Sequence, residues 1–261
     1  MYEDDIAIPE GSVRFLQLAA ERSVSIGVRG EYTASYLEKM GIHNVEIIGC
    51  PSFYWHGEQG FQLKALPPAG GSGRKLSISV TRDRDMYGFT ENLKQVHRAL
   101  LNYAIQHDGA YIVQSNFSEA LMSHHQSIEE DMLLNMLQYF QIPREQLEPF
   151  ILKGVEIFFN TTEWQQFLQP FDATVGSRFH GGMMALISGV PALWITHDVR
   201  TRELCNYLGV AQLHIDEIVA RQLSVDAMVD AIDYTGFTEH YQRRYQTYKA
   251  FLQANHLPLA F

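Results

Sequence analysis

One segment, residues 172–196, constrains the fold of this 261-residue chain more than any other stretch. It contains a short β-prone run at 173–175 that ends at Gly176, a helical run at 183–187 and a second apolar strand at 192–195. A strand, a tight turn, a helix and another strand in close succession are typical of a parallel sheet in an α/β protein.

The turn inside this segment carries polar side chains that could bind a ligand. Ser177, Arg178 and His180 stand beside Gly181 and Gly182, where the strand gives way to the helix. Open α/β sheets bind ligands at this corner, and the N–H groups of a helix start favour an anion. Arginine can clamp a phosphate or carboxylate, and histidine can transfer a proton. The spacing equally fits a surface arginine beside a helix-capping histidine.

The composition describes a globular protein with ample apolar material and limits its partners. The sequence is 46% hydrophobic and 19% charged, and its formal charge of -10 argues against nucleic acid as a partner. The two cysteines, Cys50 and Cys205, form no disulfide framework and are interpreted as reduced thiols in a cytoplasmic protein. The acidic start of the chain is no signal peptide, and no apolar stretch is long enough to span a membrane.

Strands alternate with helices along the chain, which predicts the α/β class with two Rossmann-like parallel-sheet domains. A partial N-terminal α/β domain is predicted at 1–65, and a proline- and glycine-rich linker at 66–74. A Rossmann-like domain is expected at 75–235, and a final helix at 236–257 packing back across the domains. The predicted strands are 24–28, 44–48, 75–80, 110–114, 155–159, 173–175 and 192–195, and the predicted helices are 11–22, 31–40, 90–106, 127–140, 161–168, 183–187, 197–208, 224–233 and 238–254.

Right-handed crossovers place the carboxyl ends of parallel strands at one edge of a sheet. We therefore expect Arg82, Gln114–Ser115 and Asn160 to line one crevice together with 177–180. Arg82 is predicted as a second anion contact, whereas Arg84 is expected in a solvated loop that balances its own charges.

Further cationic residues have a functional interpretation and a plain one. Arg29 follows a strand and Arg200 begins a helix, so both could add positive charge near the site, or be ordinary surface residues. The pair His124–His125 has no partner at metal-ligand spacing, and no metal site is predicted. The sequence has no P-loop, no Gly-x-Gly-x-x-Gly at a strand end and no Gly-x-Ser-x-Gly.

Several motifs resemble the polysaccharide pyruvyl transferase family. The main one is Ser177-Arg-Phe-His180, followed by an alanine- and leucine-rich helix and Gly189-Val-Pro191. Weaker matches are Val28-Arg-Gly-Glu-Tyr-Thr-Ala-Ser-Tyr-Leu37, Gly49-Cys-Pro-Ser52 and His197-Asp-Val-Arg-Thr-Arg-Glu-Leu-Cys-Asn-Tyr-Leu-Gly209. Together they cover most of the chain from about residue 23 to residue 208.

The resemblance implies two facing Rossmann-like domains similar to the GT-B architecture. It implies pyruvyl transfer from phosphoenolpyruvate to a pair of sugar hydroxyls, forming a ketal, in bacterial exopolysaccharide or cell-surface polysaccharide biosynthesis. Phosphoenolpyruvate is then a co-substrate, no cofactor or metal is required, and lipid-linked and polysaccharide acceptors both remain open. By position, the catalytic residues are Arg178 and His180, and the donor-binding residues are Arg82, Ser177, Arg178, Phe179, His180 and Gly181, with Arg29 and Arg200 as further candidates.

Two departures from the family pattern leave alternatives open. Arg200 stands where the family usually has lysine, and the region before the linker is shorter than in other members. We therefore expect an incomplete N-terminal domain, whose open sheet edge a homodimer could complete. One alternative is a nucleotide-sugar glycosyltransferase of the same architecture, with Glu203 available for a ribose. The other is a shortened, non-catalytic homologue.

Overall fold

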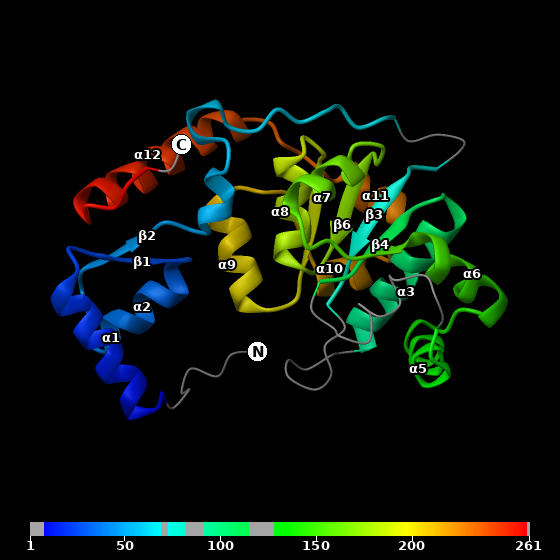
Figure 1. The fold of residues 1–261 in the computed structure, drawn as a ribbon, viewed down its shortest axis with the longest axis horizontal. Coiled ribbons are helices and arrows are strands. Elements are labelled where there is room, and N and C mark those ends of the chain that lie inside the picture. The colour runs from blue at the N-terminus through cyan, green and yellow to red at the C-terminus, as the bar shows by residue number, and fades with distance from the viewer. Residues whose placement is uncertain (1–7, 69–72, 82–90, 115–127, 260–261) are drawn as a thin grey trace. The chain divides into compact units, whose positions relative to one another are not determined.

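The computed structural model describes residues 8–68, 73–81, 91–114 and 128–259 (Figure 1). Contacts between residues divide the chain into two compact units. The smaller unit comprises residues 1–61, 198–210 and 234–261, and the larger one comprises 62–197 and 211–233. This grouping assigns 198–210 to the smaller unit, whereas the sequence analysis counted that stretch within 75–235; the domain boundaries stay a prediction.

The larger unit is built on a six-stranded sheet in which every pair of neighbouring strands is parallel. The order across the sheet is β5-β4-β3-β6-β7-β8. The strands are β3 Leu76–Ser79, β4 Ala110–Ile112, β5 Val155–Glu156, β6 Ala173–Gly176, β7 Ala192–Thr196 and β8 Gln212–His214. Every residue of β3, β6 and β7 is buried, as expected for a parallel sheet covered on both faces. The predicted α/β class is therefore confirmed.

The strand order has a reversal point that locates the site. Counted along the chain within this unit, the strands lie in the order third, second, first, fourth, fifth, sixth, which is the doubly wound arrangement. The first and fourth strands, β3 and β6, are neighbours with Ser79 opposite Gly176. Connections leave in opposite directions on either side of this pair, and doubly wound sheets bind their ligands beyond the carboxyl ends of such a pair.

The helices of the larger unit pack in two groups. Helix α3 contacts α5, α6, α10 and α11, whereas α8 packs against α7, β6 and β7. Their bounds are α3 Glu91–Gln106, α5 Glu130–Phe140, α6 Arg144–Gly154, α7 Thr161–Leu168, α8 Phe179–Ile187, α10 Ile215–Ala220 and α11 Val225–Asp230. Helices α6 and α10 and strand β8 were not predicted. Pro149 lies inside α6, and β8 and α10 are too short for a periodic pattern to stand out.

The smaller unit contains a two-stranded parallel sheet and four helices among its described residues. Its elements are α1 Glu10–Arg22, β1 Ile26–Val28, α2 Glu31–Lys39, β2 Val45–Ile47, the 3₁₀ turns η1 Pro51–Tyr54 and η2 Gly57–Gln59, α9 Val199–Leu208 and α12 Phe237–Ala254. Tyr241, Tyr245 and Tyr248 of α12 are buried, and Tyr248 stacks on Tyr54 with ring centroids 4.3 Å apart. These aromatic contacts hold α12 within the smaller unit.

Candidate functional site

The predicted anion-binding corner lies at the reversal point of the larger sheet. Strand β6 ends at Gly176 beside Ser79, the last residue of β3. A Cβ atom on Gly176 would lie 1.9 Å from the Ser79 carbonyl oxygen, so only glycine allows the two strand ends to pair this closely. The next three residues, 177–179, carry the chain from this strand end into α8.

Arg178 is fixed to the end of β3 by two hydrogen bonds. Its backbone N–H donates to the Ser79 carbonyl at 3.1 Å, and its side-chain Nε donates to the Val80 carbonyl at 3.0 Å. The residue is half-buried and occupies the position just before the first turn of α8. The guanidinium is thus held at the carboxyl end of β3, and its planar fork suits a carboxylate or a phosphate.

Phe179 and His180 form the first turn of α8 and differ in exposure. Phe179 is half-buried, its ring lies 5.9 Å from that of Trp194, and its carbonyl accepts a hydrogen bond from Trp194 Nε1 at 3.1 Å. His180 is exposed, with its ring edge-on to Phe179. The structure therefore places an anchoring phenylalanine beside a solvent-accessible histidine that a ligand could reach.

Gly181 lets the first turn of α8 sit directly on the end of β3. A Cβ atom there would lie 2.5 Å from Ser79 Oγ and 2.9 Å from Gln114 Nε2. Gln114, just beyond β4, donates a hydrogen bond to Ser79 Oγ. The predicted neighbourhood of Gln114 and the 177–180 turn is therefore observed. Asn160 instead caps α7, with Oδ1 accepting from the N–H groups of Thr162 and Glu163 at 2.8 and 3.4 Å.

The Ser177 hydroxyl belongs to a buried hydrogen-bond chain. Only 3% of Ser177 is exposed, and its Oγ accepts a hydrogen bond from Thr81 N at 2.9 Å. The same oxygen lies 3.1 Å from His97 Nε2, and His97 Nδ1 lies 2.8 Å from the Tyr139 hydroxyl. Ser177 was predicted to contact a donor ligand, and its observed contacts position the two strand ends.

His97 belongs to this network and was not among the predicted site residues. The pKa of His97 is lowered from 6.5 to about 3, chiefly by burial and then by the nearby His197 and Arg178. The imidazole is therefore neutral near pH 7. Its position in the sequence carried a signal, because His97 falls one helical turn after Leu93 on the apolar face of α3. A histidine on such a face needs hydrogen-bond partners inside the fold.

Four predicted positions or pairs cannot be placed. Arg82, Arg84, Ser115 and His124–His125 lie outside the described residues. Thr81, which directly precedes Arg82, is described and is tied to Ser177. The role of Arg82 as a second donor contact stays a prediction.

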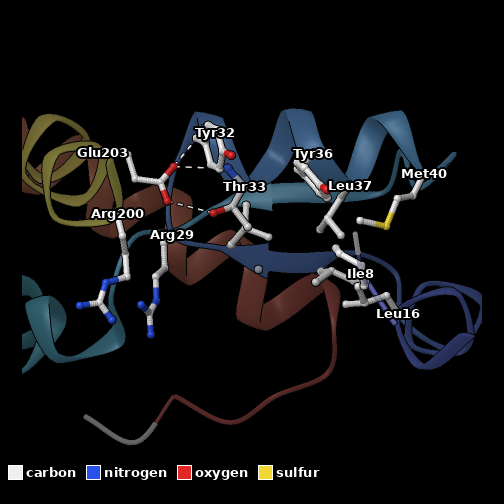
Figure 2. A pocket seen from close by; sticks show the side chains of 13 residues that line it. Ile8, Leu16, Arg29, Tyr32, Thr33, Tyr36, Leu37, Met40, Arg200 and Glu203 are labelled. Carbon is white, nitrogen blue, oxygen red and sulfur yellow. Dashed lines mark hydrogen bonds between the residues drawn. The ribbon is translucent and has the colours of Figure 1, made fainter. Parts of the chain in front are cut away.

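Arg29 and Arg200 meet at a second site, a pocket of about 570 Å³ in the smaller unit (Figure 2). Glu203 lines the same pocket, and its carboxylate caps α2. Oε2 accepts from Tyr32 N at 3.0 Å and Thr33 N at 3.3 Å, while Oε1 accepts from Thr33 Oγ1 at 2.9 Å. The carboxylate considered for a ribose is thus occupied by the start of a helix.

The part of the chain that the structure describes shows neither a metal-binding cluster nor a membrane-spanning helix. No group of three or more His, Cys, Asp or Glu side chains lies close enough together there to hold a metal ion. Within that same part of the chain, no helix combines the length and the apolar character needed to cross a membrane.

Comparison with known proteins identifies a family. The model described as polysaccharide pyruvyl transferase matches residues 6–199, which is more than half of the chain and includes the Arg178 corner. No curated protein matches the sequence significantly.

Solved structures that match this chain share little sequence with it. An S. aureus TarM mutant, in complex with fondaparinux, alpha-GlcNAc-glycerol and UDP, is 13% identical with a TM-score of 0.49, covering 97% of this chain and 47% of that one. S. aureus MnaA with UDP is 13% identical with a TM-score of 0.42, covering 94% and 66%. The glycosyltransferase SnogD from Streptomyces nogalater is 13% identical with a TM-score of 0.31, covering 84% and 56%. The chain thus spans between 47% and 66% of these proteins.

Proposed function

The chain belongs to the polysaccharide pyruvyl transferase family, and from that premise we propose that it transfers a pyruvyl group from phosphoenolpyruvate to two hydroxyls of a sugar, forming a ketal. The acceptor belongs to a bacterial exopolysaccharide or cell-surface polysaccharide, or to its precursor. The observation that carries this proposal is the anchoring of Arg178 at the reversal point of the sheet. His180, two residues further along the chain, is exposed.

The chemistry of the donor suits this corner. Phosphoenolpyruvate carries a carboxylate and a phosphate, so its binding needs a cation held in a fixed direction. Arg178 supplies a guanidinium whose Nε is already engaged by Val80, which sets the orientation of the fork. Arg82, which follows Thr81, is the proposed second cation.

The proposed reaction forms two carbon–oxygen bonds at C2 of phosphoenolpyruvate and releases phosphate. The methylene carbon of phosphoenolpyruvate takes up a proton and becomes a methyl group, while one sugar oxygen bonds to C2 and loses its proton. The bond between C2 and the phosphate oxygen then breaks, and the second sugar oxygen bonds to C2 and loses its proton as phosphate leaves. We assign the proton transfer to His180 and the stabilisation of the departing phosphate to Arg178.

We propose a cytoplasmic location and no cofactor besides the co-substrate. Both cysteines, Cys50 and Cys205, are free thiols, and Cys205 is buried, which fits a reducing compartment. The proposed reaction involves no redox step and requires no metal.

Direct binding measurements test the proposal. Calorimetric titration with phosphoenolpyruvate and with uridine diphosphate is carried out on the unmodified chain, on Arg178→Ala and on Arg221→Ala. Arg221 is exposed and directly follows α10, so it provides the matched control. We expect phosphoenolpyruvate to bind, Arg178→Ala to weaken it at least tenfold and Arg221→Ala to leave it unchanged. Binding of uridine diphosphate alone would indicate a glycosyltransferase, and binding of neither ligand would indicate a non-catalytic homologue.

A further inference from the structure

The pocket of the smaller unit has an apolar interior formed by three elements. Its volume of about 570 Å³ lies within the range of small-molecule sites. Leu16 from α1, Ile26 and Val28 from β1, and Leu37 and Met40 from the region of α2 all line it. Except for Val28 and Leu37, these side chains are only half-buried, so the interior is open to a ligand. An apolar lining of this kind favours the hydrocarbon part of a molecule.

One end of this pocket is cationic. Arg29 directly follows β1, is exposed and makes no hydrogen bond or ion pair within the described part of the chain. Arg200 has an ion pair with Asp198 at 4.0 Å, the outer limit for such a contact. The other oxygen of Asp198 accepts a hydrogen bond from Thr201 N at 2.6 Å and caps α9. Most of the charge of both guanidinium groups is therefore available to a ligand.

The neighbouring carboxylate does not neutralise these arginines. Glu203 directs its oxygens to the N–H groups at the start of α2, as described above. In Figure 2 both guanidinium groups are turned away from Glu203, and Ile8, Leu16 and Met40 lie at the opposite end of the pocket. Because the start of α2 is capped by Glu203, an anion in this pocket would be held by Arg29 and Arg200 and not by the helix terminus.

We propose that this pocket binds an amphipathic anion: a hydrocarbon chain lies along the apolar interior, and a phosphate head group contacts Arg29 and Arg200. Burial of the chain and pairing of the head group act at opposite ends of the same ligand, which matches the division of the pocket. The inference does not rest on the proposed function. The pocket is formed within the smaller unit, whereas the Arg178 corner belongs to the larger one.

The test measures binding of decyl phosphate, decanol and inorganic phosphate below the concentration at which decyl phosphate forms micelles. We expect decyl phosphate to bind at least tenfold more tightly than either of the others. Shortening the chain should weaken binding about fourfold for each methylene removed from the pocket, the fold-change that corresponds to the transfer energy of one CH₂ group. Equal binding of decyl phosphate and decanol, or no binding of either, overturns the proposal.

Variants separate the pocket from unspecific adsorption. The double variant Arg29→Gln/Arg200→Gln should bind decyl phosphate no better than decanol. Arg202 is exposed on α9, the helix that carries Arg200, but does not line the pocket. Arg202→Gln should therefore leave the binding of decyl phosphate unchanged. An equal loss in both variants overturns the proposal. Sedimentation gives a further check. If the chain forms a dimer that decyl phosphate neither binds nor dissociates, the proposal is also overturned, because a second copy would then cover the pocket.

A vesicle experiment distinguishes a membrane lipid from a soluble amphiphile as the source of the phosphate head group. Retention of the chain on vesicles containing phosphatidic acid, lost in the double variant, identifies a membrane lipid as the ligand class. Binding of decyl phosphate in solution without retention on vesicles identifies a soluble amphiphile. Decyl phosphate binding should be unchanged in Arg178→Ala, the variant that tests phosphoenolpyruvate binding, because Arg178 does not line this pocket. Failure of this inference and failure of the proposed function are therefore distinguishable.

Discussion

His97 Nε2 lies 3.1 Å from Ser177 Oγ, although the two residues are 80 positions apart in the chain. Through this contact, helix α3 supports the turn that carries Arg178. The chain of hydrogen bonds continues to Tyr139 on one side and to Thr81 N on the other. A neutral, buried histidine thus joins α5, α3 and the ends of β3 and β6 beneath the candidate site.

Ser177→Ala should lower the free energy of unfolding by about 1–3 kcal/mol, because it leaves Thr81 N–H and His97 without their shared partner in a buried place. Urea unfolding followed by tryptophan fluorescence measures this change, with the buried Trp194 as a reporter in the larger unit. Ser35→Ala is the control: that hydroxyl is exposed, and its loss should cost less than about 0.5 kcal/mol. Equal effects of the two substitutions would contradict the positioning role.

The pKa of His97 predicts how stability depends on pH. Because the pKa is lowered from 6.5 to about 3 in the folded state, the unfolded chain binds a proton below pH 6.5 that the folded chain does not. Stability is therefore lost as the pH falls from 6.5 towards 3, by up to about 1.4 kcal/mol per pH unit from this group. Unfolding midpoints at pH 7, 6 and 5 should fall less steeply in His97→Gln than in the unmodified chain. The exposed His43→Gln should keep the original slope, and a shared slope in all three proteins would refute the assignment.

Gly176→Ala should be among the most destabilising single substitutions in the larger unit. The added Cβ would lie 1.9 Å from the backbone oxygen of Ser79, which cannot rotate away. We expect a loss of about 3 kcal/mol or more, since overpacking against backbone forces the paired strands apart. Gly11→Ala is the control, because its added Cβ meets nothing within 4 Å. Its midpoint in thermal unfolding should stay the same or rise, whereas that of Gly176→Ala should fall sharply.

Arg178→Lys should not preserve binding of phosphoenolpyruvate. Lysine keeps the charge but has no counterpart of the Nε–H that donates to Val80, so the cation loses its fixed direction. We expect affinity to fall at least about tenfold, which corresponds to about 1.4 kcal/mol. Arg221→Lys, at an exposed position directly after α10, should have no effect. Full affinity in Arg178→Lys would mean that charge alone holds the donor.

Glu203→Ala should destabilise the smaller unit by about 0.5–2 kcal/mol, the usual cost of removing a helix cap. The carboxylate accepts hydrogen bonds from the backbone of Tyr32 and Thr33, and no other cap of α2 is observed in the described residues. Hydrogen exchange of the amides in the first turn of α2 should quicken. Glu38→Ala, at an exposed position in the same helix, should leave that exchange unchanged.

Local sequence patterns predicted much of the fold and one end of the candidate site. The apolar spacing of residues 11–22 and 161–168 corresponds to α1 and α7, and the 172–196 segment folds as the expected strand, turn, helix and strand. These features depend on neighbours two to four positions apart, which set strand and helix faces. The same segment therefore indicated that Arg178 and His180 stand at a strand end.

Tertiary structure decided which distant residues meet. The order of the strands made β3 and β6 neighbours and placed Ser79 opposite Gly176. Packing of α3 brought His97 to Ser177, and packing of α9 brought Glu203 to the start of α2. None of these pairings leaves a periodic trace in the sequence, because each depends on chain crossings and on the burial of groups 80 to 171 positions apart. The sequence by itself thus determined the α/β pattern and the Arg-Phe-His turn, and the folded chain determined the hydrogen bonds that support that turn.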